Sequence, residues 1–386
     1  MAVFLDHAAT SPLRPEALAA LTTALSQLGN PSSTHSHGQA TREILEQARD
    51  KIAHAVGCNR SEVIFCSGGT EANNQAIKGI WWSRKSPTRK VIISSPLEHK
   101  ALLDPIEWLV ANEGAELLEV PIRHGAVDLA ALENILLNRH NEIALISLMW
   151  VNNETGVITD IDRVVKLAKG YEIPVHSDAV AALGRVPINF AQSGLTVMSI
   201  SGHKVGAPIG IGALIVRRDA KPSSLIHGGG QERGLRSGTM NYSLASAFAA
   251  AAEQAVAQLA ETQSRLKQLR DRIESEVKSA IPSVIITANG AMRVEHNAHF
   301  IFPGVNNDSL LFLLDQQGVS VSAGSACQAG VLGPSHVLIG MGYSEAEAAS
   351  CLRVTLGYTS TEQDAEAFVA ALKSAYPKAL AASPSR

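Results

Sequence analysis

The stretch VMSISGHKVG, residues 197–206, joins a short apolar run to a lysine that stands close to two glycines. The run has the length of a buried strand, and Ser201 and Gly202 end it. Lys204 therefore follows the carboxyl end of a strand, which is where open parallel sheets bind ligands. Most lysines lie on solvated faces. A lysine held among polar groups at a strand end can instead form a Schiff base. Burial near other cations lowers its pKa, so that the amine loses its proton and can react.

Similar apolar runs recur on both sides of this stretch, with helix-period segments between them. One amphipathic stripe ends at Gly57 and another, over residues 161–168, ends at Gly170. Strands that alternate with helices predict an α/β fold with a mostly parallel sheet and helices on both faces. The predicted strands are 62–66, 90–94, 117–120, 143–148, 173–176, 197–200 and 213–216.

The pattern changes near residue 245, where we predict one long helix over about 243–280 and then a smaller α+β unit. Ser360, with Gln363 three residues later, predicts the start of the last helix through a capping box. We predict a large domain over residues 16–255, a small domain over 256–386, and an N-terminal segment, 1–15, packed on the small domain. The end of the chain, AASPSR (381–386), is predicted to be disordered.

The composition is that of an ordinary globular protein. The chain has 386 residues, of which 46% are hydrophobic, and a net charge of -3, so no basic field indicates binding to nucleic acid or an anionic membrane. The first ten residues, MAVFLDHAAT, show no signal-peptide pattern, and no apolar run is long enough to cross a bilayer. We therefore expect a cytoplasmic protein. Its cysteines form no CxxC pair, and we interpret Cys58, Cys66 and Cys351 as small buried hydrophobic residues.

Two more motifs lie at strand ends. Ser67-Gly68-Gly69-Thr70 comes between a strand and a helix, where backbone N–H groups can hold a phosphate, although a plain tight turn would have the same sequence. Asp178 ends another strand. Its carboxylate could cap a helix or could keep the pyridinium nitrogen of pyridoxal phosphate (PLP) protonated.

A run of small residues, SAGSACQAG, covers residues 322–330 and contains Cys327. Because little bulk surrounds this cysteine in sequence, it suits a mobile nucleophile better than a core residue. The loop of about 320–335 is therefore predicted to be mobile and catalytic.

Together and in this order, the motifs resemble the cysteine desulfurases of the NifS/IscS type, which belong to the class-V aminotransferases and to fold-type I PLP enzymes. The resemblance covers nearly the whole chain, and its GSAC loop is similar to that of the subgroup with a long, mobile cysteine loop. The motifs that carry it are LDHAAT (5–10), NPSS (30–33), SGGTE (67–71), EHK (98–100), VNNETG (151–156), HSDA (176–179), SGHK (201–204), HGGGQER (227–233), RSGT (236–239) and GSAC (324–327).

The resemblance implies a role for each matched residue. Lys204 would carry PLP covalently, His99 would stack on its ring and move protons, and Asp178 would pair with the ring nitrogen. Asn153 would lie near the ring oxygen and the substrate, and Arg353 would bind the substrate carboxylate. The remaining cofactor-binding set is Gly69, Thr70, Ser201, Gly202, His203 and Thr239, the last reaching the phosphate of the neighbouring subunit in a homodimer.

The same resemblance implies the reaction. L-cysteine would become L-alanine, with a persulfide left on Cys327, and the sulfur would pass to an iron–sulfur scaffold protein or a tRNA-thiolation protein. Cys327 could also serve as a transient iron–sulfur ligand with a scaffold partner. No other metal site is predicted.

One position departs from the family. The family commonly has a glutamine whose amide donates to the ring's phenolic oxygen, and Ala181 stands there in this chain. A selenocysteine lyase or another PLP aminotransferase-class enzyme is the alternative reading. A weakened binding subunit of a sulfur-transfer complex is a third, and only Ala181 favours it.

Overall fold

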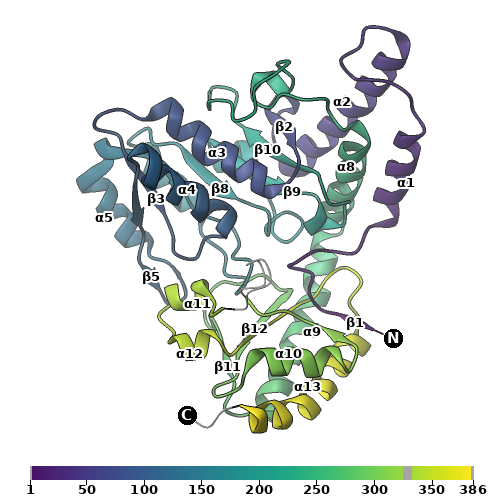
Figure 1. The fold of residues 1–386 in the computed structure, drawn as a ribbon, viewed down its shortest axis with the longest axis vertical. Helices are drawn as coiled ribbons and strands as arrows, with labels where there is room; N and C mark the ends of the chain where they lie inside the picture. Colours follow the sequence, from purple (N-terminus) through teal and green to yellow (C-terminus); the bar gives the residue numbers. More distant parts are fainter. Residues whose placement is uncertain (1, 325–332, 384–386) are drawn as a thin grey trace.

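The computed structural model describes residues 2–324 and 333–383. Its central feature is a seven-stranded sheet (Figure 1). All seven predicted strands are present, with ends within two residues of the predicted ones, and the mostly parallel α/β fold is confirmed. In spatial order the strands are β2 (Val63–Cys66), β10 (Gly212–Val216), β9 (Val197–Ser201), β8 (Val175–Asp178), β7 (Ile143–Ser147), β3 (Val91–Ser94) and β4 (Glu116–Glu119).

One strand runs against the others. β10 is antiparallel to both of its neighbours, with Gly212 opposite Cys66 on β2 and opposite Ser201 on β9. The other six strands therefore share one direction, and their carboxyl ends form a single edge. The segments that carry His99, Asp178 and Lys204 leave the sheet at this edge.

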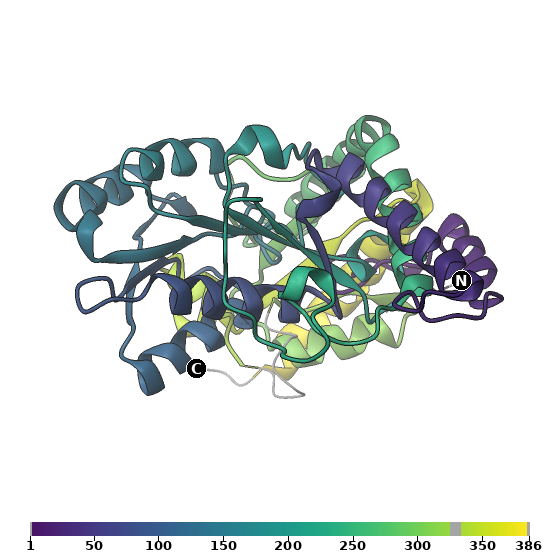
Figure 2. The same cartoon turned by 90° about the horizontal axis from the view of Figure 1, so that it is seen from above.

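Successive side chains on each strand point to opposite faces, and both faces are buried. Ile64 and Ile92 lie in a cluster covered by α3 (Gly69–Arg84) and α4 (Lys100–Glu113). Their neighbours Phe65 and Ile93 face a larger cluster on the other side, and Figure 2 shows helices on both faces. The helices of the larger cluster are α2 (Ser36–Val56), α5 (Leu129–Arg139), α6 (Ile161–Lys169), α7 (Phe190–Ser193) and α8 (Tyr242–Ala257), with α1 (Pro15–Leu25) against α8. Gly57 ends α2 in the left-handed conformation, as its position predicts.

A second group of elements surrounds a separate hydrophobic cluster (Figure 1, bottom). A short parallel pair, β1 (Val3–Phe4) with β13 (Val319–Ser320), accompanies the main antiparallel sheet of this group. A separate antiparallel pair, β5 (Ile122–Arg123) with β6 (Ala126–Val127), packs Val127 against the larger cluster of the first group. Val3 and Leu5 from the chain start are buried in the cluster of this second group. The domain boundaries at residues 15 and 255 stay predictions. The elements are β1 (Val3–Phe4), α9 (Leu259–Ala280), β11 (Ile285–Ile286), β12 (Asn297–Ile301), α10 (Asn307–Asp315), β13 (Val319–Ser320), α11 (His336–Gly340), α12 (Glu345–Ala348), β14 (Cys351–Thr355) and α13 (Glu362–Ala382).

The prediction of one long helix over 243–280 is wrong. The helix breaks at Gln258, whose backbone leaves helical geometry at φ -92° and ψ 5° and whose side chain accepts a hydrogen bond from Arg14 Nη1 at 2.9 Å. The physical reason is that the two halves bury different faces. α8 packs on α1 and α2, whereas α9 contributes to the other core and packs on α13.

Two predictions at the end of the chain also need correction. The box that caps α13 is Thr361 with Asp364, one residue later than predicted, because the Ser360 hydroxyl instead accepts from the backbone N–H of Gly357 at 2.9 Å. Residues 381 and 382 are helical rather than disordered, and Ser383 Oγ accepts from the Asn306 N–H at 2.8 Å. The last three residues lie outside the described part.

Candidate active site

A cavity of about 280 Å³ opens at the carboxyl edge of the parallel strands and is closed on its far side by β14 and the chain start. Sequence reasoning placed its candidates at strand ends, and the structure brings most of them to this one cavity. The predicted residues that line it are Gly69, Thr70, His99, Asn153, Asp178, Ser201, His203, Lys204 and Arg353.

Asp178 ends β8, and its carboxylate is held by two donors. Asn73 Nδ2 donates to one oxygen at 2.7 Å, and the backbone N–H of Val180 donates to the other at 2.9 Å. Asn73 is 1% exposed and also lines the cavity. Sequence reasoning missed Asn73. Its place one helical turn after Gly69, facing the sheet, is the signal that could have found it.

Lys204 extends from the turn after β9 into the cavity, where its ammonium donates to the carbonyl oxygens of Ala8 and Ala9, the latter at 2.9 Å. These carbonyls belong to the LDHAAT motif at the start of the chain. The motif's contribution to the site is therefore backbone acceptors that hold the lysine nitrogen in place.

His99 is the N-cap of α4, and its Nδ1 accepts from the backbone N–H of Ala101 at 3.0 Å. This bond leaves the proton of the neutral ring on Nε2. Burial lowers the pKa of His99, and the charges of Lys204 and His336 lower it further, while Asp178 opposes them. The ring is thus held in one neutral tautomer.

The opposite end of the cavity fits a phosphate. α3 begins at Gly69 with no side-chain cap, so its first N–H groups stay available, and a Cβ at Gly69 would lie 2.7 Å from Val180 Cγ2. Ser201 Oγ is buried and has no hydrogen-bond partner among the described residues. Burial and the nearby Lys204 lower the pKa of His203 to about 4, so its ring is neutral. A hydroxyl donor and an open helix start suit a phosphate monoester, and Lys204 and Asp178 of the same cavity suit the aldehyde and the ring nitrogen, so the residues present fit PLP.

Arg353 lies in the middle of β14 and is 2% exposed. Its Nη2 pairs with Asp6 at 2.8 Å, and its Nη1 donates to the Asn153 carbonyl at 3.0 Å. Its Nε is buried and has no partner within the described ranges. The bonds to Asp6 and Asn153 use two of the five N–H groups, so a fixed guanidinium that lines the cavity keeps donors for a carboxylate there. Asp6 is a second residue that sequence reasoning did not assign.

Two predicted residues do not line the cavity. Gly202 makes the turn after β9, with its N–H donating to the Ile211 carbonyl at 3.0 Å. Thr239 is exposed and outside the cavity, on a segment held by the ion pair between Arg236 and Glu71 at 2.8 Å. Cys327 lies outside the described residues, as does the middle of the predicted mobile loop, residues 325–332.

The other cysteines behave as predicted for small hydrophobic residues. Cys66 and Cys351 are buried and Cys58 is half-buried, and all three thiols are free. Burial raises the pKa of Cys58 and Cys66 to about 12 and that of Cys351 to about 11. None of the three is a thiolate at neutral pH, so none is suited to act as the nucleophile.

His176, which sequence reasoning left open, is a structural residue. It is fully buried, with Nδ1 2.8 Å from Ser147 Oγ and Nε2 2.9 Å from Ser199 Oγ. Burial lowers its pKa to about 3, so it stays neutral.

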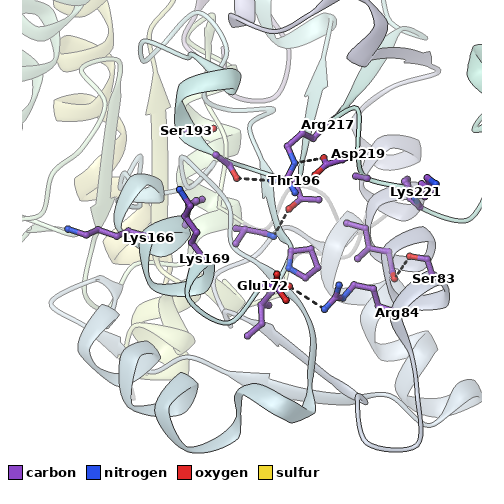
Figure 3. A pocket seen from close by; sticks show the side chains of 18 of the residues that line it. Ser83, Arg84, Lys166, Lys169, Glu172, Ser193, Thr196, Arg217, Asp219 and Lys221 are labelled. Atoms are coloured by element: carbon purple, nitrogen blue, oxygen red, sulfur yellow. Dashed lines mark hydrogen bonds and ion pairs between the residues drawn. The ribbon is translucent and has the colours of Figure 1, made fainter.

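A larger cavity, about 1020 Å³, lies at the other edge of the sheet and is shown in Figure 3. Basic and acidic side chains alternate around it, and Arg217 already pairs with Asp219 at 2.6 Å. It is lined by residues near the amino ends of β8 and β9, such as Pro174 and Thr196. Since none of the predicted site residues reaches it, and since open sheets bind ligands at the carboxyl ends, the first cavity is the candidate site.

The fold and this site together define a fold-type I PLP enzyme. The model of the aminotransferase class-V family matches residues 3–368, and the chain belongs to that family, whose members depend on PLP. The resemblance predicted from sequence and the predicted cofactor are thereby confirmed.

Within this family, the chain is similar to cysteine desulfurases. The chain is 46% identical over 380 residues to an IscS-like cysteine desulfurase of Mycobacterium tuberculosis, covering 97% of this chain and 96% of the relative. It is 34% identical to the cysteine desulfurase NifS of Azotobacter vinelandii, covering 94% and 89% of the two chains. Among solved structures, a NifS-like protein matches with a TM-score of 0.90 and 30% identity, over 98% of this chain and all of the other.

Two further observations concern metal binding and membrane insertion. In residues 2–324 and 333–383, no cluster of three or more His, Cys, Asp or Glu side chains could hold a metal ion. No helix in these ranges is long and apolar enough to span a membrane.

Proposed function

We propose that this protein is a PLP-dependent cysteine desulfurase that converts L-cysteine to L-alanine and keeps the sulfur as a persulfide on Cys327. The observation that carries the proposal is the convergence of Lys204, Asp178, His99 and Arg353 on one cavity. The cysteine desulfurase names of its relatives support it. When bound through Lys204 with its ring nitrogen on Asp178, PLP would draw electrons from the substrate's α-carbon and make the α-proton acidic.

Arg353 would bind and orient the substrate. Its Nε points to no protein acceptor among the described residues, while Asp6 and the Asn153 carbonyl fix the rest of the guanidinium. A substrate carboxylate at this guanidinium would hold the amino acid in one orientation, with its amino group available to Lys204. The guanidinium geometry favours a carboxylate over a smaller anion.

His99 would hold a proton at Nε2, because Nδ1 is committed to the start of α4. Taking up a second proton would break the bond to Ala101, and burial already disfavours the charged ring. Neutral His99 is therefore suited to donate a hydrogen bond from Nε2 into the cavity, and it can move a proton only through a short-lived charged ring whose Nδ1 has released the Ala101 N–H.

The sulfur step belongs to Cys327. Its thiolate would form a bond to the substrate sulfur as the substrate's carbon–sulfur bond breaks. That electron pair would stay with the β-carbon, which takes up one proton, the equivalent of the one that the Cys327 thiol released, and becomes the alanine methyl group. Both flanks of the segment that carries Cys327 reach Glu154, beside the cavity. Ser335 Oγ donates to its Oε2 at 2.5 Å, and a Cβ at Gly324 would clash with the same carboxylate.

The remaining assignments concern partners. We propose a homodimer in which exposed Thr239 reaches the partner's phosphate site, supported by its place outside its own cavity. An iron–sulfur scaffold protein or a tRNA-thiolation protein would accept the sulfur, and Cys327 could act as a transient cluster ligand in such a complex. We also place the protein in the cytoplasm, since a reducing compartment keeps the described thiols free.

The test is to incubate the purified yellow protein with L-cysteine and dithiothreitol and to measure sulfide and alanine together. Equal amounts of the two are expected, with none from Lys204→Ala. Alanine formation that requires a keto acid would indicate an aminotransferase. Turnover of selenocysteine alone would indicate a selenocysteine lyase, and neither product would indicate a binding subunit.

A further inference from the structure

A second, nearly closed pocket lies directly behind the active site. It has a volume of about 20 Å³, and we call it the rear pocket. It shares lining residues with the active-site cavity, among them Lys204, Ala181 and Asn153, so the two spaces are neighbours. The side chain at position 181 ends at Cβ and does not fill the space between them. The lining of the rear pocket includes Lys204, Ala181, Asn153, Arg185, His296 and Asn297.

Arg185 brings a positive charge to the rear pocket that no protein group balances. Burial lowers its pKa to about 10 and the charge of Arg14 lowers it further, while no acidic group within the described residues counteracts this shift. His7 also lines the rear pocket, and burial followed by the charge of Arg185 lowers its pKa to about 3. The same two causes keep the pKa of His296 well below its ordinary value, so both rings are neutral. Arg185 is half-buried, and a cation that has no counter-charge among the described residues favours an anionic ligand atom.

The rear pocket also has room and partners for one water molecule. A water needs roughly 10–15 Å³ and two to four polar neighbours. The side-chain oxygens of Asn153 and Asn297 are both buried and lack a hydrogen-bond partner among the described residues. Both residues line the pocket with Arg185, which supplies the donors.

The chemistry of PLP identifies the anionic atom. Its phenolic oxygen sits on the ring carbon next to the aldehyde carbon, so linkage to Lys204 brings that oxygen beside the nitrogen of a residue that lines both spaces. We propose that Arg185 is a positioning residue for the cofactor, which stabilises the negative charge of this oxygen through the rear pocket, directly or through one bound water. This inference rests on the proposed PLP chemistry at Lys204.

The consequence is that Ala181 does not leave the cofactor's oxygen without a donor. The glutamine expected at this position would fill the rear pocket, whereas the alanine leaves it open to Arg185. The positive charge should favour the form of the cofactor linkage that has lost its proton, because that form carries one more negative charge. Removing the charge should therefore keep the protein yellow to higher pH.

The experiment compares three variants with the wild type: Arg185→Met, Arg185→Lys, and the double variant that carries both Arg185→Met and Ala181→Gln. Each protein is loaded with PLP and studied without cysteine. Arg185→Met should lose PLP on dialysis roughly tenfold faster, as expected for one hydrogen bond to a charged group, and its yellow band should titrate at higher pH. Arg185→Lys should stay near the wild type. Adding Ala181→Gln to Arg185→Met should restore most of the retention.

A purely structural role for Arg185 would give a different result. Unfolding temperatures would fall, but Ala181→Gln would not rescue retention, and the pH of the yellow band would not move; that outcome overturns the inference. Arg270→Met is the control, since Arg270 is also a largely buried arginine but pairs with Asp271 at 2.7 Å and lines neither space. Borohydride labelling of Lys204 separates the two proposals, because an unlabelled wild type refutes the cofactor chemistry rather than the role of Arg185.

Discussion

Replacing Asn73 by alanine should weaken PLP binding although Asn73 carries no charge. Asn73 supplies one of the two donors that hold the Asp178 carboxylate, at 2.7 Å, and both side chains are buried. A hydrogen bond to a charged group contributes roughly 1.5–3 kcal/mol. The Val180 N–H remains, and a water can enter the space left by the amide, so we take the lower end of that range.

A loss of about 1.5 kcal/mol corresponds to roughly tenfold weaker binding. The assay is titration of the apoprotein with PLP, followed by the yellow band or by quenching of tryptophan fluorescence. Asn73→Asp should lose more, because a second carboxylate against the first raises the pKa of the pair and leaves one of the two protonated.

Asn74→Ala is the matched control. Asn74 is the next residue on the same helix, and its amide donates to the Thr70 carbonyl at 3.0 Å rather than to the carboxylate. It should bind PLP as the wild type does. If folded Asn73→Ala binds PLP within twofold of the wild type, then Asn73 does not hold Asp178 for the cofactor and the reasoning is wrong.

Three other predictions concern the site, and a fourth concerns the buried His176. Borohydride reduction and peptide mapping should place the pyridoxyl group on Lys204, and a label on another lysine would refute that assignment. Cys327→Ser should stay yellow and fold normally but release no sulfide; wild-type activity would point to another nucleophile. Thr239→Ala should weaken PLP retention in a dimer, whereas a fully active monomer in sedimentation at micromolar concentration would exclude the shared site. Burial lowers the pKa of His176 to about 3 from 6.5, so the unfolded chain binds the extra proton below pH 6.5 and stability falls as pH drops toward 3. The urea midpoint should therefore be lower at pH 5 than at pH 7, and His176→Gln should reduce that difference.

The strands and the candidate cavity were largely predictable because both depend on local signals. An apolar run that ends in glycine or serine defines a strand end, and strand ends in a parallel sheet meet at one edge. The direction of β10 was not predicted, although residues 202–211 are too short a connection for the crossover that a parallel neighbour of β9 requires. Its pairing with β2 joins Gly212 to Cys66, which is far away in sequence. The helix breaks at Gln258 because α8 and α9 pack into two different hydrophobic clusters. Helical periodicity alone does not show that the apolar residues of 243–280 belong to two clusters.

The supporting residues of the site were the harder part. Asn73 and Asp6 have no motif-level chemistry of their own, and each matters because of the charged group that it contacts. Arg185 lies four residues after Ala181, and only the three-dimensional structure places both on one pocket with Lys204. The sequence therefore reveals the groups that react more readily than the groups that hold them.

The most direct test of the account is a single turnover with L-cysteine in the absence of any thiol reductant, followed by peptide mass mapping and alanine measurement. If Cys327 takes the sulfur, one alanine is expected for each Cys327 peptide that gains the mass of one sulfur atom, and Cys58, Cys66 and Cys351 should stay unmodified. Alanine without a modified Cys327 peptide, or the added sulfur on another cysteine, would contradict it.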